Sequence, residues 1–228
     1  MIAKRQGTFI TIEGIDLVGK STLLSNLEKL KTFSNIVVFS EFSESEMGQM
    51  LKKLLKNNIL LRFEQRCNTS FVETLLLLSE SFFRYDVEIL PLLIKKMFVV
   101  KERFIDSHIA YQIPIIISEF PDLCQSTLVK WFEHIVKIRG DILPDLTIIL
   151  DCEPEIIFKR YHQALTEYER RILTQVRNIY LEMPHIYPPT LKPERITIIK
   201  TTNKDVKTVT DLVIEAIQNK LFEGGEIL

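Results

Sequence analysis

Two glycines lie five residues apart, at Gly14 and Gly19, and Lys20 and Ser21 follow directly. This spacing is typical of a phosphate-binding loop, in which successive backbone N–H groups point inward at polyphosphate oxygens. The lysine of such a loop bridges the outer two phosphates of a nucleoside triphosphate, and the hydroxyl after it is a ligand of Mg²⁺. The sequence therefore predicts a site for a magnesium-bound nucleoside triphosphate. We expect its lining to be Gly14, Ile15, Asp16, Leu17, Val18, Gly19, Lys20, Ser21 and Thr22.

The predicted loop lies between a strand and a helix. Residues 8–13 form an apolar, β-branched run that is typical of a buried strand, and leucines recur at helical spacing over residues 22–30. The positive end of the helix dipole adds to the attraction for phosphate. A chance match on a glycine-containing turn would not need these flanks, which favours the phosphate-binding interpretation.

Strands and helices alternate along the rest of the chain. Further strands are predicted at residues 35–42, 98–102, 145–151 and 195–200, and helices at 47–57, 64–94, 106–118, 121–137, 154–160, from the charged stretch 161–171 to just before Pro184, and at 206–221. This order predicts an α/β, three-layer P-loop NTPase fold in which a five-stranded parallel sheet has helices on both faces, as a single domain over residues 1–228. Ligands of such sheets gather at the carboxyl ends of the strands, here at residues 13–16, 40–44, 102–106 and 151.

Composition restricts the kind of partner. The 228 residues carry a net charge of −1, with 46% hydrophobic and 26% charged residues, so there is no general electrostatic reason to bind polymeric nucleic acid. The first residues do not resemble a signal peptide, and no run approaches the roughly 20 apolar residues of a membrane span. Three widely spaced cysteines without a metal-binding pattern suit a reducing compartment. We therefore expect a cytoplasmic protein with no membrane partner.

Several segments together resemble the thymidylate kinases of the nucleoside monophosphate kinase group. They include Phe-Ile-Thr-Ile-Glu-Gly-Ile-Asp at residues 9–16, with an aspartate inside the loop, and Glu-Arg-Phe-Ile-Asp-Ser at residues 102–107 followed by Ala-Tyr-Gln at residues 110–112. Residues 144–160 resemble the segment that leads into the lid of that family, and residues 180–182 resemble the helix beyond it. The order and spacing of these segments agree with the family from about residue 8 to residue 182.

The resemblance implies transfer of the γ-phosphoryl group of ATP to a nucleoside monophosphate, most simply thymidine monophosphate (dTMP), with Mg²⁺. Fixed cations would bring the two anionic phosphates together, and the metal would absorb developing charge. It implies that Arg103 holds the acceptor phosphate and that Asp16 contacts the acceptor sugar. Glu102 would act near the metal, with Ser21, or near the attacking oxygen. Tyr111 and Gln112 would lie against the bound nucleotide.

A short lid is implied at about residues 160–171. It lacks the arginine pairs that are usual in the family, but Arg170 and Arg171 could reach the transferred phosphoryl group, and we take Arg170 as the catalytic candidate. The variable positions of the phosphate-binding loop hold no arginine, so a catalytic arginine should come from the lid. A homodimer would also suit the family.

The acceptor side departs from the family pattern. Ser40 stands where the second strand of the family carries a phosphate-binding arginine. Leu77 and Ser81 fall where the long helix of the family carries a stacking phenylalanine and a base-binding arginine. A shifted alignment would offer Phe82, Phe83 and Arg84 instead, so Arg84 is a candidate substrate-binding residue. These changes favour an altered choice of acceptor.

Two alternatives remain open. Deoxynucleoside kinases carry a glutamate at the end of the second strand as a base for the sugar hydroxyl and a Glu-Arg pair after the third strand. Glu41 and the pair Glu102-Arg103 fit that pattern, so Glu41 is a candidate substrate-binding residue. A degenerate kinase that binds nucleotide without transfer would keep the donor loop and lose acceptor groups, although the retained Lys20 and Arg103 argue against it.

Overall fold

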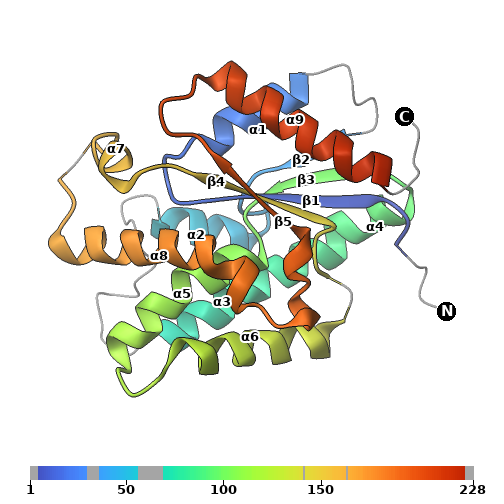
Figure 1. Cartoon of the computed structure of the whole chain (residues 1–228). Helices are drawn as coiled ribbons and strands as arrows, with labels where there is room; N and C mark the ends of the chain where they lie inside the picture. The colour runs from blue at the N-terminus through green and yellow to red at the C-terminus, as the bar shows by residue number, and fades with distance from the viewer. Residues whose placement is uncertain (1–4, 30–35, 56–68, 141, 163, 224–228) are drawn as a thin grey trace.

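Five parallel strands form one sheet in the order β2-β3-β1-β4-β5 (Figure 1). The computed structural model describes residues 5–29, 36–55, 69–140, 142–162 and 164–223. The strands are β1 (Thr8–Glu13), β2 (Ile36–Phe39), β3 (Phe98–Glu102), β4 (Leu146–Asp151) and β5 (Ile196–Lys200).

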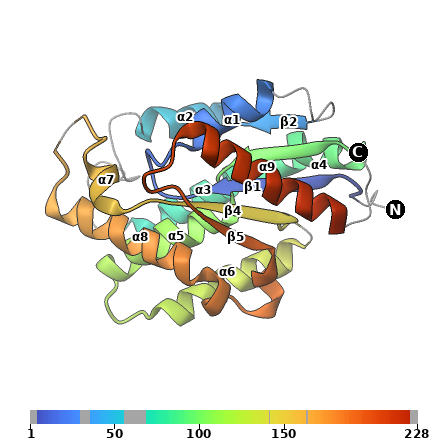
Figure 2. The same cartoon turned by 45° about the horizontal axis from the view of Figure 1, so that its top comes forward.

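Helices cover both faces of the sheet, as Figures 1 and 2 show from two directions. The helices α1 (Lys20–Lys29) and α9 (Val206–Glu223) lie on one face. The other face carries α3 (Ser70–Arg84), α5 (Ile105–Glu119) and α8 (Glu167–Ile186), with α6 (Gln125–Arg139) packed outside α5. The short helices are α2 (Glu46–Leu55), α4 (Leu90–Ile94) and α7 (Pro154–Phe158). This arrangement confirms the predicted three-layer α/β fold.

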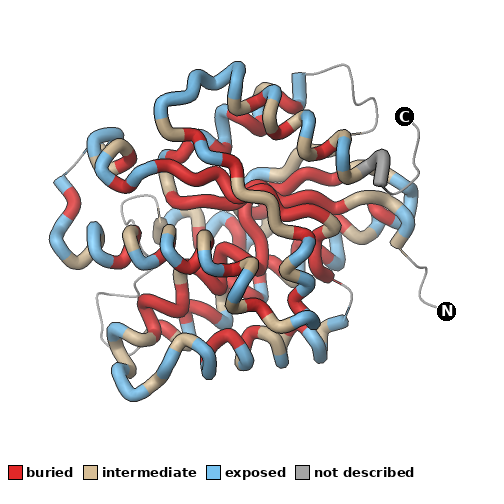
Figure 3. Tube along the Cα trace, in the orientation of Figure 1, coloured by how far each residue is buried: buried red, intermediate tan, exposed pale blue. Residues whose placement is uncertain are grey.

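The centre of the sheet is the most deeply buried part of the molecule (Figure 3). Every residue of β4 is buried, as is every residue of β1 after Thr8, because both strands have a neighbour on each side and helices above and below. Ile12 of β1 pairs with Glu102 of β3, so these two strands end next to each other. The polar residues that follow them therefore meet at one edge of the sheet.

The predicted long helix at residues 64–94 is interrupted. Residues 64–68 lie outside the described residues, and α3 is followed by a π-helical turn, η1 (Tyr85–Ile89), before α4. Pro91 lies in the first turn of α4. Because proline has no N–H, it cannot make the α-helical bond to the carbonyl of Val87, and the wider turn precedes it, with the Leu90 N–H bonded to the Tyr85 carbonyl.

The helix predicted after residues 161–171 is α8 (Glu167–Ile186). The prediction that it ends before Pro184 is wrong, because α8 continues to Ile186. The helix begins at a capping box in which Thr166 and Glu169 exchange hydrogen bonds. Ile179 and Met183 belong to the buried face of α8. The packing of this face keeps the helix continuous, although Pro184 cannot make one of the backbone hydrogen bonds. Within the described part of the chain, no helix combines the length and apolar character needed to cross a membrane.

Candidate active site

The loop between β1 and α1 has the backbone of a phosphate cradle. Gly14 and Gly19 have φ angles of 129° and 110°, and Leu17 between them has a φ of 60°. A Cβ atom on Gly14 would lie 2.5 Å from the Leu150 carbonyl oxygen, so only glycine fits there. Helix α1 begins at Lys20, directly after the loop, and Thr22 is exposed in its first turn. The N-terminus of the helix therefore points at the place where the phosphates would lie.

Lys20 is folded over this loop. Its Nζ donates hydrogen bonds to the carbonyl oxygens of Ile15 at 2.9 Å and Gly14 at 3.2 Å. The side chain is buried, and this desolvation, together with the positive charge of Arg103, lowers the pKa of Lys20 to about 8. A bound polyphosphate would favour the charged form.

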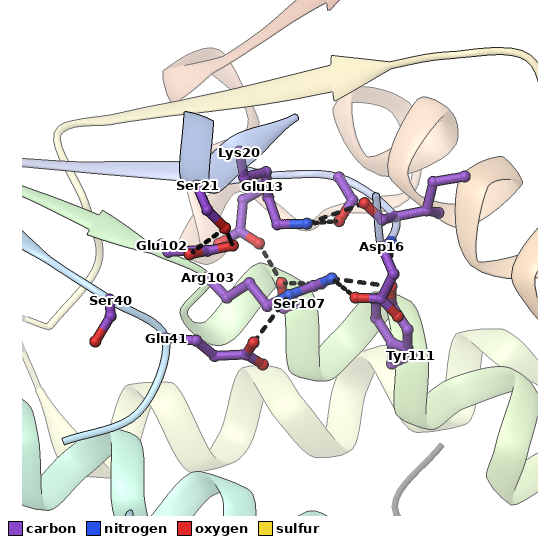
Figure 4. Close-up of polar contacts among 12 residues, drawn as sticks. Glu13, Asp16, Lys20, Ser21, Ser40, Glu41, Glu102, Arg103, Ser107 and Tyr111 are labelled. Atoms are coloured by element: carbon purple, nitrogen blue, oxygen red, sulfur yellow. Dashed lines mark hydrogen bonds and ion pairs between the residues drawn. The ribbon is translucent and has the colours of Figure 1, made fainter. Parts of the chain in front are cut away.

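The side chains of Ser21, in the first turn of α1, and Glu102, at the end of β3, face each other (Figure 4). The Ser21 hydroxyl lies 3.2 Å and 3.3 Å from the two carboxylate oxygens of Glu102. One hydroxyl and one carboxylate next to a phosphate cradle suit Mg²⁺, which prefers oxygen ligands and keeps several waters and phosphate oxygens in its shell. No cluster of three or more His, Cys, Asp or Glu side chains that could hold a metal occurs among the described residues.

Arg103 is the centre of the polar contacts at this edge of the sheet (Figure 4). Its Nη2 donates to Asp16 Oδ1 at 2.5 Å and to the Tyr111 hydroxyl at 3.1 Å. The guanidinium also lies over the Tyr111 ring, 4.7 Å from the ring centre. Its Nε lies 3.5 Å from Glu41 Oε2, the longest of these contacts. The structure thus brings together Asp16, Glu41, Arg103 and Tyr111 from four different segments.

Glu41 faces Arg103 from the segment after β2. Its side chain is 37% exposed, so one side of the carboxylate is open. Desolvation raises the pKa of Glu41, and the positive charge of Arg103 opposes this rise. A partly open carboxylate with a raised pKa can exchange a proton with a ligand, which makes Glu41 a candidate for more than an ion pair.

A buried layer supports Arg103 from behind. The Arg103 Nη1 donates to Ser107 Oγ at 3.2 Å, and Ser107 in turn contacts the carboxylate of Glu13 and, at 2.7 Å, the hydroxyl of Tyr180. Glu13 also accepts the backbone N–H of Phe104 at 2.8 Å. Burial raises the pKa of Glu13. These bonds tie β1, α5 and α8 together and fix the direction of the Arg103 side chain.

The sequence predicts that Ser40, Leu77 and Ser81 stand at acceptor-binding positions, and two of these three residues are buried. Ser40 is exposed and points away from the Arg103 cluster (Figure 4). Leu77 packs with Phe42 and Leu51, and Ser81 Oγ lies 2.7 Å from His108 Nε2. Burial lowers the pKa of His108 to about 3, so the ring is neutral.

Arg84 contacts the segment that follows β2. Its Nη1 donates to the Ser40 carbonyl at 2.8 Å, its Nε pairs with Glu88 at 3.1 Å, and its guanidinium covers the Phe39 ring. The side chain is 5% exposed. Gln112 is likewise buried, and its carbonyl oxygen accepts the Thr74 hydroxyl at 3.0 Å.

The predicted lid brings a different arginine to the loop than expected. Arg160 Nη1 donates to the Leu17 carbonyl at 2.8 Å, which places its guanidinium beside the phosphate cradle. Arg170 instead bonds the Leu165 carbonyl at 3.3 Å and covers the Phe158 ring, and Arg171 lies over Tyr168.

Sequence reasoning missed three side chains of this site. Lys101 is a lysine inside an apolar strand, and that contrast could have drawn attention to it. Arg160 lies at the start of the predicted lid, at about residues 160–171, and the basic side chain there was the available signal. Tyr161 gave no signal, yet its hydroxyl is buried without a hydrogen-bond partner among the described residues, and its charge interactions are with Asp16 and Arg103.

Comparisons with known proteins identify relatives of this chain. The thymidylate kinase family profile matches residues 12–213. A probable thymidylate kinase of Methanococcoides burtonii is 27% identical over 215 residues, which is 93% of this chain and 96% of the relative. A probable thymidylate kinase of Pyrobaculum aerophilum is 34% identical over 177 residues, which is 76% of this chain and 81% of the relative.

Solved structures show the same fold. The thymidylate kinase of Candida albicans superposes with a TM-score of 0.68 at 24% identity and covers 95% of this chain and 93% of its own. That of Ehrlichia chaffeensis gives a TM-score of 0.63 at 23% identity, with 93% of this chain and 99% of its own covered.

Proposed function

The chain belongs to the thymidylate kinase family, and we propose that it transfers the γ-phosphoryl group of ATP to dTMP, giving dTDP and ADP. The observation that carries this proposal is the meeting of three groups at one edge of the sheet: Lys20 in the phosphate cradle, the Ser21–Glu102 pair and the Arg103 guanidinium. Phosphoryl transfer needs little covalent chemistry from a protein, but it needs two phosphates held close together by fixed charges.

On the donor side, the loop would hold ATP. The backbone N–H groups between Gly14 and Ser21 would surround the β-phosphate, and Lys20 would leave the loop carbonyls to bridge the β- and γ-phosphates. Ser21 and Glu102 would hold Mg²⁺, which supplies positive charge to the phosphate oxygens when bound.

On the acceptor side, Arg103 would hold the phosphate of dTMP. This phosphate would displace Glu41 from Nε, since that ion pair is longer, at 3.5 Å, than the pair with Asp16, while Asp16 would keep Nη2 in place. Asp16 would also face the acceptor sugar, and Tyr111 and Gln112 would line the nucleotide. Because Ser81 offers no positive charge to a base, we propose that the choice of acceptor base is broader than in a site built around a base-binding arginine.

The short lid would complete the site during transfer. We propose that residues 1–228 act as one P-loop kinase domain, with a lid at about residues 160–171. Arg160, already bonded to the phosphate cradle, is placed better than Arg170 to neutralise charge on the transferred group.

A second candidate function is a deoxynucleoside kinase. The Arg103–Glu41 contact favours it, because a carboxylate beside the acceptor position suits a sugar hydroxyl that must lose a proton better than it suits a phosphate. In that reaction Glu41 would take the proton from the hydroxyl, and Arg103 would orient the carboxylate.

We further propose that the protein forms a homodimer through an apolar stripe on α3 and η1. Val72, Leu75, Phe83 and Val87 are between 41% and 61% exposed there and recur at helical spacing. Light scattering during size-exclusion chromatography would show a mass near 53 kDa, twice 26.7 kDa, for a dimer. A cytoplasmic location remains a prediction.

The proposed reaction is tested by ADP release with ATP, Mg²⁺ and each deoxynucleoside monophosphate and nucleoside in turn. We expect turnover with dTMP and slower turnover with other monophosphates. Turnover with nucleosides alone would select the second candidate, and ATP binding without turnover would select a degenerate kinase.

A further inference from the structure

Lys101 is a charged residue inside the sheet, at the carboxyl end of β3. It is 1% exposed, and its Nζ donates to the backbone carbonyls of Glu41 at 2.6 Å, Arg103 at 2.8 Å and Glu102 at 3.0 Å. An ammonium group has three N–H donors, so each of them has a carbonyl partner. Charge-assisted hydrogen bonds of this kind are among the stronger ones in a protein.

The Lys101 ammonium lies where the pairing between β2 and β3 ends. Phe39 and Lys101 are the last paired residues of β2 and β3, and beyond them the two segments diverge toward the site. The Glu41 carbonyl therefore lies past the end of the ladder. Lys101 joins it to the β3 side, so that the two segments stay at a fixed spacing after their backbone pairing has ended.

The three carbonyls belong to three residues of the proposed site. Arg103 has a φ of 56°, a conformation that costs a non-glycine residue roughly 1 kcal/mol or more. The bonds from Lys101 to the Glu102 and Arg103 carbonyls hold this turn, and the turn directs the Arg103 side chain toward Asp16. The bond to the Glu41 carbonyl fixes the backbone position from which the Glu41 side chain extends.

Two other buried charged side chains hold the same segment after β2. Arg84 Nη1 bonds the Ser40 carbonyl at 2.8 Å, and Glu80 Oε1 accepts the Ser43 N–H at 2.7 Å. Taking charges out of water is costly, and an apolar side chain would fill this volume with less penalty. No apolar side chain could hold three carbonyls, so the arrangement points to positioning rather than to packing.

We propose that Lys101 is a positioning residue of the acceptor side, which acts through the backbone of Glu41, Glu102 and Arg103; this inference rests on the proposed kinase function. Glu41 and Arg103 lie on the acceptor side, and the Glu102 carboxylate is held separately by the Ser21 hydroxyl. The effect of removing Lys101 should therefore fall mainly on the acceptor.

The first test is the Lys101→Met variant, which keeps the length of the side chain and removes its donors. We expect the KM for dTMP to rise at least tenfold while the KM for ATP stays within twofold. Lys130→Met, at an exposed position on α6, is the matched control and should change neither. Unchanged dTMP kinetics, or equal increases in both KM values, would overturn the inference. If the unaltered protein does not use dTMP, the proposed function fails instead.

A second variant serves if Lys101→Met does not fold. Lys101→Gln keeps a polar side chain, but its amide has two N–H donors, so it can bond two of the three carbonyls at most. We expect dTMP binding, measured by calorimetry without ATP, to weaken at least fivefold in this variant, while ATP binding measured in the same way stays within twofold. An affinity for dTMP equal to that of the unaltered protein would contradict the proposal.

Discussion

At the scale of single residues, the site is a small set of opposite charges that a substrate must rearrange. Arg103 has carboxylates on two sides, Asp16 at 2.5 Å and Glu41 at 3.5 Å, and Lys20 is bonded to the loop carbonyls. Charges held in this way are oriented before a ligand arrives, which lowers the cost of reorganising them during transfer. Glu41 is the unusual member, because it lies where an incoming phosphate needs positive charge.

Arg103→Met should mainly harm use of the acceptor. Loss of the guanidinium removes the cation that forms ion pairs with both Asp16 and Glu41, so the KM for dTMP should rise by a factor of ten or more and kcat should fall, while ATP affinity changes little. Steady-state kinetics with each substrate varied in turn checks this result. Acceptor kinetics equal to those of the unaltered protein would reject Arg103 as the phosphate-binding residue.

At the scale of elements, the parts set by local patterns were predicted from sequence, and the parts set by contacts between distant segments were not. The strand before Gly14 and the helix after Lys20 follow from nearby residues alone, and the structure has both. The passage of α8 through Pro184 depends on the packing of its buried face against distant segments such as α5. Lys101 could not be placed from sequence, because its partners come from two different strand ends.

The predicted lid is a second case in which contacts between distant segments decide what the sequence alone could not. Sequence reasoning preferred Arg170, but Arg160 bonds the Leu17 carbonyl of the loop, whereas Arg170, in the first turn of α8, bonds the Leu165 carbonyl. Arg160→Ala should lower kcat at least tenfold with little change in either KM, because its charge would act mainly during transfer. Arg170→Ala is the comparison and should lower kcat by less than threefold. The reverse order of effects in stopped-flow measurements of transfer would return the role to Arg170.

At the scale of the whole molecule, a buried ion pair joins the sheet to the layer formed by α5 and α8. Both side chains of the Arg195–Asp106 pair are nearly unexposed, and their two contacts measure 2.6 Å and 2.7 Å. Thr147 and Tyr187 also donate to Asp106, at 2.9 Å each. The positive charge of Arg195 helps to hold the pKa of Asp106 below its ordinary value against the effect of burial.

Arg195→Met should lower the free energy of unfolding by about 3–5 kcal/mol, because it leaves the Asp106 carboxylate buried without its counter-charge. Arg139→Met is the control, since it breaks the partly exposed pair with Asp86 and should cost no more than about 1 kcal/mol. Urea denaturation followed by circular dichroism measures both. Equal losses in the two variants would show that burial does not decide the value of these pairs.

The central claim is that this molecule moves the γ-phosphoryl group of ATP to a nucleoside monophosphate. The most direct test is to incubate the protein with Mg²⁺, dTMP and ATP labelled in the γ-phosphate, and to separate the products. We predict label in dTDP, in amounts equal to the ADP formed, with no transfer after Mg²⁺ is chelated and with severe loss of transfer in Lys20→Ala. Label found only in inorganic phosphate, or dTDP formation that survives in Lys20→Ala, would contradict the account.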